Sequence, residues 1–258
     1  MTRSRSCAVG VAAAAVLFVA VGACGSPPRG SSSGITGTVN VFAAASLTEA
    51  FTQIGRDFEV ATPGVKVTFN FAGSPALATQ INEGAPADIF AAASPATMRT
   101  VTEAGNADGT PVIFVRNQLV IAVAEGNPKG ITGLRDLTRP DLQLALCAEQ
   151  VPCGAAAKKA LDVAKVTLKP VTLEQDVKAA LSKVKLGEVD AAIVYRTDAM
   201  AATAGVDGIE FPESAGAIND YPIVVLKSAP NRAGAQAFLA YVRSQGRAVL
   251  TAAGFKTP

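Results

Sequence analysis

The chain has 258 residues and is almost balanced in charge, with 23 Lys and Arg against 21 Asp and Glu. Its basic residues do not form the clusters that recognition of nucleic acid or anionic lipid requires, so we exclude nucleic acid as a partner. The chain also contains no histidine and only four cysteines. A tetrahedral zinc site is therefore disfavoured, and we expect neither a metal centre nor a cofactor.

The first 23 residues predict an export signal. Arg3 and Arg5 precede an apolar segment at residues 8–21, and small residues lead directly to Cys24. This pattern is typical of a secretory signal peptide and is shorter than the roughly 20 apolar residues of a spanning helix. The place of Cys24 resembles a bacterial lipoprotein signal; the alternative is a non-lipidated signal peptide with a chance cysteine. We expect removal of residues 1–23, a lipid such as palmitate on Cys24, and an extracytoplasmic protein anchored to the cell membrane.

Residues 24–34 are rich in Gly, Ser and Pro and predict a flexible tether. Loss of Arg3 and Arg5 with the signal peptide leaves equal numbers of basic and acidic side chains. The sequence from Ile35 onward is long enough for one large or two modest globular domains.

Beyond the tether, apolar segments of strand length alternate with amphipathic segments of helical period. We predict strands at residues 38–43, 65–71, 88–92, 118–124, 142–147, 190–195 and 221–226. We predict helices at residues 47–60, 75–82, 95–104, 155–161, 177–185 and 232–243. Apolar strands between amphipathic helices indicate an α/β fold, with parallel-rich sheets that helices cover on both faces.

Ligands of open α/β sheets bind beyond the carboxyl ends of the strands, where helices begin. Four strand-to-helix junctions stand out. Ser46 is expected to cap its helix in a capping box with Glu49, and Ser74 to cap the next helix. Residues 151–154 and 173–177 open two further helices. Serine is common at helix starts without any ligand, but four such starts could converge on one cleft.

Two cysteines remain once Cys7 has left with the signal peptide and Cys24 carries the lipid. Cys147 and Cys153 would then lie in an oxidising compartment, so a disulfide between them is the natural hypothesis. A zinc site is the weaker alternative, because two cysteines do not complete a tetrahedral shell.

In order and spacing, several segments of the chain resemble the periplasmic molybdate-binding proteins that serve ABC transporters. The matching segments are residues 41–47 (VFAAASL), 71–74 (FAGS), 80–81 (QI), 83–90 (EGAPADIF), 151–154 (VPCG), 176–177 (DV), 193–195 (IVY) and 252–255 (AAGF). The resemblance covers nearly all of the chain beyond the tether. It implies an extracytoplasmic receptor that captures molybdate, and also tungstate, for an ABC transporter permease.

The resemblance also implies a ligand set. Carried over residue by residue, it assigns molybdate to the hydroxyls of Ser46, Ser74 and Tyr195 and to the backbone amides of Cys153 and Val177. The Cys153 position is commonly alanine in this family, so a bridge to Cys147 would affect the conformation of the binding loop. The alternative for Tyr195 is an ordinary core tyrosine at the end of a strand.

The chemistry of these groups agrees with such a ligand. Molybdate is a dianion that needs only hydrogen-bond donors, whereas a protonated phosphate also needs an acceptor. No Lys or Arg falls inside the matching segments, so helix N-termini and amides would balance the charge. Asp176 would repel a dianion if it pointed inward, and we expect it to point outward.

The resemblance implies a two-lobed periplasmic-binding-protein fold of type II with the ligand cleft between the lobes. Residues 35–116 with 204–258 would form the first lobe, and residues 117–203 the second. Such lobes close around a ligand, and the closed form is what a permease could recognise. We expect a monomer.

Three other functions stay open. A sulfate or other oxyanion receptor would use similar donors, and cavity size would have to discriminate. An extracytoplasmic hydrolase is disfavoured because the chain has no histidine and no Gly-x-Ser-x-Gly motif, and its serines lack an evident base. We therefore expect no enzymatic activity. A sensor lipoprotein without a transport role would need the same fold.

Overall fold

The computed structural model of the protein describes residues 34–258. The predicted signal peptide, the predicted lipidation site Cys24 and nearly all of the predicted tether lie outside these described residues. Within them, two five-stranded sheets carry the fold. The first has the order β2-β1-β3-β10-β4, and the second has the order β7-β6-β8-β5-β9.

The strands of the first sheet are β1 (Gly37–Ala44), β2 (Val65–Ala72), β3 (Ile89–Ala91), β4 (Val112–Asn117) and β10 (Asn219–Val225). The strands of the second sheet are β5 (Leu119–Ala124), β6 (Leu144–Cys147), β7 (Thr172–Glu174), β8 (Ala191–Tyr195) and β9 (Val206–Ile209). Each sheet has three neighbouring parallel strands, to which two further strands are joined by antiparallel pairing. Both sheets are therefore mixed, and the expected parallel character is limited to β2, β1 and β3 in one and to β7, β6 and β8 in the other.

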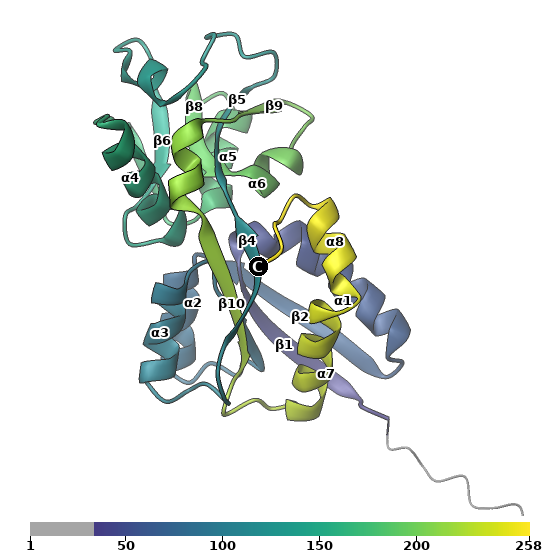
Figure 1. Ribbon diagram of the computed structural model, residues 1–258. Coiled ribbons are helices and arrows are strands. Elements are labelled where there is room, and N and C mark those ends of the chain that lie inside the picture. Colours follow the sequence, from purple (N-terminus) through teal and green to yellow (C-terminus); the bar gives the residue numbers. More distant parts are fainter. Residues whose placement is uncertain (1–33) are drawn as a thin grey trace, which may run out of the picture. The chain divides into compact units, whose positions relative to one another are not determined.

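Helices pack on both faces of the first sheet (Figure 1). On one face lie α2 (Ser74–Asn82) and α3 (Pro95–Glu103), and on the other lie α1 (Thr48–Ala61), α7 (Arg232–Arg243) and α8 (Gly246–Ala252). The apolar face that the sequence predicts for α1 is buried, and the ring centroid of Phe238 lies 6.2 Å from that of Phe51 and 5.3 Å from that of Phe58. Packing of this aromatic cluster fixes α1 against α7, which holds the start of α1 at the sheet edge.

The second sheet is covered by α4 (Pro152–Ala164), α5 (Val177–Lys185) and α6 (Arg196–Met200). Short 3-10 helices complete the chain at η1 (Ala45–Leu47), η2 (Leu134–Thr138) and η3 (Pro212–Ala217). Among residues 34–258, no helix has the length and apolar character needed to cross a membrane.

The chain passes from the first sheet to the second between β4 and β5 and returns between β9 and β10. We call the elements around the first sheet the first lobe and those around the second sheet the second lobe. Strand β9 pairs with β5, and η3 packs on α4. The second sheet therefore continues beyond residue 203, where the sequence placed the end of the second lobe, and the return crossing comes just before Asn219.

Most predicted elements are present with small shifts of their ends. Strands β4, β7 and β9 and helices α6 and α8 were not predicted from the sequence. Two of these strands have only three or four residues, and β9 contains a glycine, so they carry little of the apolar periodicity on which the prediction depends.

Candidate functional site

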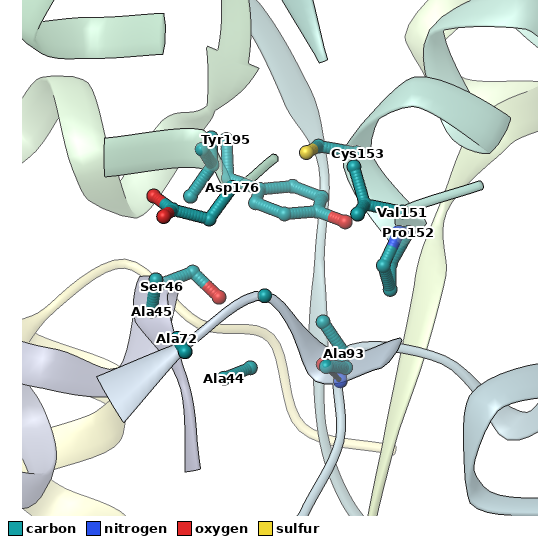
Figure 2. Close-up of a pocket in the computed structure, with 13 residues that line it drawn as sticks. Ala44, Ala45, Ser46, Ala72, Ala93, Val151, Pro152, Cys153, Asp176 and Tyr195 are labelled. Carbon is teal, nitrogen blue, oxygen red and sulfur yellow. Dashed lines mark hydrogen bonds between the residues drawn. The ribbon is translucent and has the colours of Figure 1, made fainter. Parts of the chain in front are cut away.

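A small cavity lies where the carboxyl ends of the parallel strands of the two sheets meet. The segments that line it come from both lobes: residues 44–46, 72–74 and 93 from the first, and residues 151–153, 176–177 and 195 from the second. All five residues that the resemblance assigned to the ligand are among them (Figure 2). The cavity offers about 20 Å³ to the centre of a water-sized sphere. Since pockets for drug-sized organic molecules span about 300–1,000 Å³, this cavity fits only a very small group or ion.

Ser46 reaches the cavity from η1, at the end of β1. It does not cap α1, because Leu47 occupies the N-cap position and no side chain forms a capping hydrogen bond there. The predicted capping box with Glu49 is therefore wrong. Instead, the Ser46 Oγ lies 2.8 Å from the Tyr221 hydroxyl on β10. Ser46 therefore contacts the hydroxyl of Tyr221, from a strand distant in sequence, instead of a backbone amide of α1.

Ser74 is the first residue of α2, and Gly73 holds the N-cap position without a side-chain hydrogen bond. The predicted N-cap role of Ser74 is therefore also wrong. Its Oγ accepts a hydrogen bond from the backbone N–H of Ala93 at 3.0 Å, which ties the start of α2 to the segment after β3. Gly73 lies so close to the carbonyl oxygen of Gln175 in the second lobe that an added Cβ would overlap it.

Cys153 is the second residue of α4, which begins at Pro152 and so starts before the predicted helix at residue 155. Its amide N–H has no acceptor among the described residues, as the first N–H groups of a helix normally lack one. The next residue, Gly154, touches the backbone of Ala148, where a Cβ would overlap the carbonyl oxygen. A disulfide joins Cys153 to Cys147 in the structure, with 5.8 Å between their Cα atoms. The start of α4 is thus held to the end of β6.

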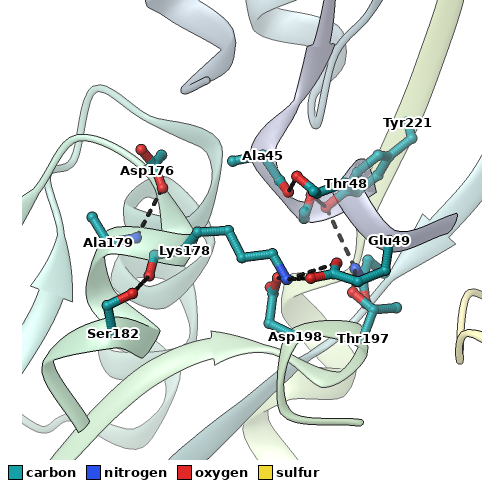
Figure 3. A network of polar contacts seen from close by, with 12 residues as sticks. Ala45, Thr48, Glu49, Asp176, Lys178, Ala179, Ser182, Thr197, Asp198 and Tyr221 are labelled. Carbon is teal, nitrogen blue, oxygen red and sulfur yellow. Dashed lines mark hydrogen bonds and ion pairs between the residues drawn. The ribbon is translucent and has the colours of Figure 1, made fainter. Parts of the chain in front are cut away.

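Val177 is the first residue of α5, and its amide N–H likewise has no acceptor among the described residues. Asp176 caps the helix, and its Oδ1 accepts a hydrogen bond from the Ala179 N–H at 2.9 Å. Its carboxylate is thus turned back onto its own helix (Figures 2 and 3). Of the described residues that line the cavity, only Asp176 carries a carboxylate, and none is Lys or Arg.

Tyr195 ends β8, and its side chain is fully buried. Its hydroxyl oxygen accepts a hydrogen bond from Asn219 Nδ2 at 2.7 Å, and its ring meets the Tyr221 ring edge-on with 5.9 Å between centroids. Burial, together with the neighbouring Tyr221, raises the pKa of Tyr195 well above its ordinary value. Tyr195 therefore stays neutral and keeps its hydroxyl hydrogen.

An ion cluster links the lobes beside the cavity (Figure 3). Lys178 Nζ lies 2.7 Å from an oxygen of Glu49 on α1 and 3.0 Å from Oδ1 of Asp198 on α6. Asp198 is completely buried, and this burial raises its pKa to about 6 although Lys178 opposes the shift. Burial also disfavours the ammonium of Lys178, but the carboxylates of Asp198 and Glu49 outweigh it and raise the Lys178 pKa.

Sequence reasoning did not find Asn219, Tyr221 or Asp198. The first two lie near the start of β10, away from the strand-to-helix junctions where ligands were expected, and Asp198 stands in what reads as an ordinary polar turn. Only the aromatic ring at Tyr221 gave a local signal. Among the described residues, no group of three or more Cys, Asp and Glu is placed to hold a metal ion.

Comparison with known proteins places this arrangement in a family. The family model of bacterial extracellular solute-binding proteins matches residues 39–256. A molybdate-binding protein of Mycobacterium tuberculosis is 45% identical over 250 residues, which cover 95% of each chain.

Two solved structures are similar in fold. The periplasmic molybdate-binding protein of Azotobacter vinelandii has a TM-score of 0.74 at 21% identity, over 85% of this chain and 99% of that one. The sulfate-binding protein SubI of Mycobacterium tuberculosis has a TM-score of 0.72 at 19% identity, over 85% of this chain and 86% of that one. They confirm the predicted fold of two helix-flanked sheets. The chain belongs to the family of bacterial extracellular solute-binding proteins and, within it, is similar to the molybdate-binding members.

Proposed function

We propose that the protein is a molybdate receptor that delivers its ligand to the permease of an ABC transporter. The observation that carries the proposal is the cavity itself: the described residues that line it include three buried hydroxyls and two helix-start amides without an acceptor in the described part of the chain, and none of them is Lys or Arg. The 45% identity to a molybdate-binding protein over nearly the whole chain supports the same ligand. A fully deprotonated tetrahedral dianion suits such a cavity, because every contact it needs is a donated hydrogen bond.

We assign the ligand to the hydroxyls of Ser46, Ser74 and Tyr195 and to the amides of Cys153 and Val177. The first turns of α2, α4 and α5 border the cavity, and their aligned N–H dipoles favour negative charge there. Hydrogen bonds to a charged group contribute about 1.5 to 3 kcal/mol each. After desolvation and ordering costs, several of them are consistent with dissociation constants from roughly micromolar to nanomolar.

Selectivity follows from charge state and size. A ligand that carries a hydrogen needs an acceptor, and the only carboxylate among the described lining residues, Asp176, has its Oδ1 turned onto the Ala179 N–H of its own helix. Hydrogen phosphate is therefore expected to bind weakly. Tungstate matches molybdate in charge and closely in size, so it should bind as well. Sulfate offers the same acceptors on a smaller ion and is the main competitor.

The remaining parts of the proposal concern the setting of the receptor. The two lobes close on the oxyanion, and the permease recognises the closed form. The protein acts outside the cytoplasm as a monomer, held at the membrane by a lipid on Cys24, and the Cys147–Cys153 disulfide persists there. It has no catalytic activity.

Isothermal titration calorimetry of the purified protein with molybdate, tungstate, sulfate and phosphate, all at equal ionic strength, tests the proposal. One-to-one binding of molybdate and tungstate, with much weaker sulfate and phosphate, is the expected result. Sulfate binding tighter than molybdate would make the protein a sulfate receptor, and the absence of any oxyanion binding would refute the proposal.

A further inference from the structure

Each of the three hydroxyls at the cavity has a polar partner behind it. Ser74 Oγ accepts from the Ala93 N–H at 3.0 Å, and Tyr195 Oη accepts from Asn219 Nδ2 at 2.7 Å. Ser46 Oγ contacts the Tyr221 hydroxyl at 2.8 Å. A hydroxyl has one hydrogen and can also accept. When the partner behind it donates, the hydroxyl's own hydrogen is left for a ligand in front.

The neighbours of Asn219 fix the direction of its hydrogen bond. Its Nδ2 lies 2.8 Å from the carbonyl oxygen of Ala93 and 3.3 Å from that of Pro152. Carbonyl oxygens only accept, so the amide must turn its NH₂ group toward them. The two hydrogens of this NH₂ group go to the two nearest acceptors, the Ala93 carbonyl at 2.8 Å and Tyr195 Oη at 2.7 Å, so the hydrogen of Tyr195 is free to point into the cavity. Asn219 lies on the first sheet, whereas Pro152 and Tyr195 belong to the second lobe, so these contacts of Asn219 join the two lobes.

A second chain of hydrogen bonds reaches Ser46. The side chain of Asn117 is buried, and its Oδ1 accepts from the Gln118 N–H at 2.9 Å. Its Nδ2 therefore faces Thr197 Oγ1 at 2.8 Å and, in a longer contact, Tyr221 Oη at 3.5 Å. Either hydroxyl could donate in the contact between Ser46 and Tyr221; because Asn117 Nδ2 faces the Tyr221 oxygen, we assign Tyr221 as the donor, which leaves the hydrogen of Ser46 for the cavity.

We propose that Asn219 and Tyr221 are positioning residues, which turn the hydroxyl hydrogens of Tyr195 and Ser46 toward the ligand and make the cavity a donor-only site. This inference rests on the proposed oxyanion function and adds to it the residues that enforce the preference for a ligand without hydrogens. Neither residue touches the ligand in this account. Burial raises the pKa of the Tyr221 hydroxyl, so it stays protonated and able to donate.

A double-mutant cycle with sodium molybdate, measured by calorimetry on the purified protein, tests the role of Asn219. In the wild-type background, Asn219→Leu should weaken molybdate binding by about 10- to 100-fold, the equivalent of one hydrogen bond to a charged ligand. Without the amide, no donor occupies the Tyr195 oxygen, so the Tyr195 hydrogen is no longer directed into the cavity. In the Tyr195→Phe background there is no hydroxyl to orient, so Asn219→Leu should weaken molybdate binding by less than about threefold.

The matched control is Asn82→Leu, which removes hydrogen bonds to Thr100 and Asn106 at the far end of α2 and should leave molybdate affinity unchanged. Thermal melting without ligand establishes that each variant is folded, and Asn219→Ala repeats the cycle if Asn219→Leu does not fold. An equal loss in both backgrounds would mean that Asn219 only joins the lobes, and it would overturn the inference. No loss in the wild-type background would overturn it as well. A wild-type protein that binds no oxyanion would instead refute the proposed function, and this inference with it.

Discussion

Replacement of Lys178 by Met should destabilise the protein by an amount that depends on pH. Lys178 is the cation between the exposed Glu49 and the buried Asp198. At pH 7.5 the Asp198 carboxylate, whose pKa is about 6, is charged and paired. Removal of the ammonium leaves this charge buried without a partner, which is strongly unfavourable.

Protonation of Asp198 limits the loss of stability in the Lys178→Met variant. With a pKa of about 6, the charged form in the wild-type protein is favoured at pH 7.5 by about 2 kcal/mol over the protonated form. The variant can always take up the proton, so Asp198 contributes at most about 2 kcal/mol to the loss of stability. The exposed pair with Glu49 adds about 1 kcal/mol or less. We therefore expect the free energy of unfolding to fall by about 2 to 3 kcal/mol at pH 7.5.

The sign of the pH dependence follows from the raised pKa of Asp198. The folded state keeps a proton that the unfolded state loses above pH 4, so wild-type stability falls as pH rises from about 4 to about 6 and is then level with respect to this group. At pH 5 Asp198 is already mostly protonated, and the substitution should cost no more than the exposed pair. The difference in the free energy of unfolding between wild type and variant therefore increases above pH 6.

Urea unfolding without ligand at pH 5.0 and pH 7.5 measures both values. Lys183→Met is the matched control, since Lys183 lies on the same helix and pairs with the partly exposed Glu188 at 2.6 Å. It should change stability little, and equally at both pH values. A Lys178→Met penalty that is the same at both pH values, or a penalty well above 4 kcal/mol at pH 7.5, would refute the reasoning, because protonation of Asp198 could not then be what limits the cost.

Three further results are expected. Gly73→Ala should weaken molybdate binding by about tenfold or more, which corresponds to about 1.4 kcal/mol, because the new Cβ meets the Gln175 carbonyl and holds the lobes apart. Calorimetry measures the affinity. Small-angle scattering with saturating molybdate should show that the variant is less compact than the wild type. Tyr195→Phe should weaken binding by about 10- to 100-fold with an unchanged fold, since one hydrogen bond to the anion is lost; unchanged affinity would remove Tyr195 from the ligand set. Reduction of the Cys147–Cys153 disulfide should lower the free energy of unfolding by about 2 kcal/mol, and intact-mass analysis with alkylation should show both thiols blocked only after reduction.

Two substitutions serve as controls for the first two of these variants. Gly216→Ala places a methyl group where no heavy atom lies within 4 Å, so it should leave affinity and compaction unchanged. Tyr241→Phe removes a hydroxyl from a ring that packs on Phe58, away from the cavity, and should not alter binding. If Gly73→Ala were as neutral as Gly216→Ala, the contact between Gly73 and Gln175 would not control closure.

The elements that the sequence predicted well are those whose signal is local. The apolar spacing of α1 placed its ends within a residue, and α5 begins and ends at the predicted residues 177 and 185. The segments at the ends of the strands likewise pointed to one edge of each sheet. Apolar periodicity is a property of neighbouring residues, so it can be recognised without the fold.

The roles of the cavity serines could not be predicted in the same way. Ser46 and Ser74 look like helix caps, yet their oxygens meet Tyr221 and the Ala93 N–H. Tyr221 lies 175 positions from Ser46 in the chain, and no local pattern reports such a partner. The ion pair between Lys178 and Glu49 has the same origin, because α1 and α5 are brought together only when the lobes meet. The contacts that orient the hydrogen-bond donors are therefore tertiary contacts between distant residues, which the sequence does not reveal.

The most direct test of the central claim is X-ray diffraction from crystals grown with molybdate, with data collected on both sides of the molybdenum absorption edge. We expect one strong anomalous peak in the cavity, within reach of the hydroxyls of Ser46, Ser74 and Tyr195 and of the amides of Cys153 and Val177. A cavity without the peak at saturating molybdate, or a peak held by other residues, would contradict it.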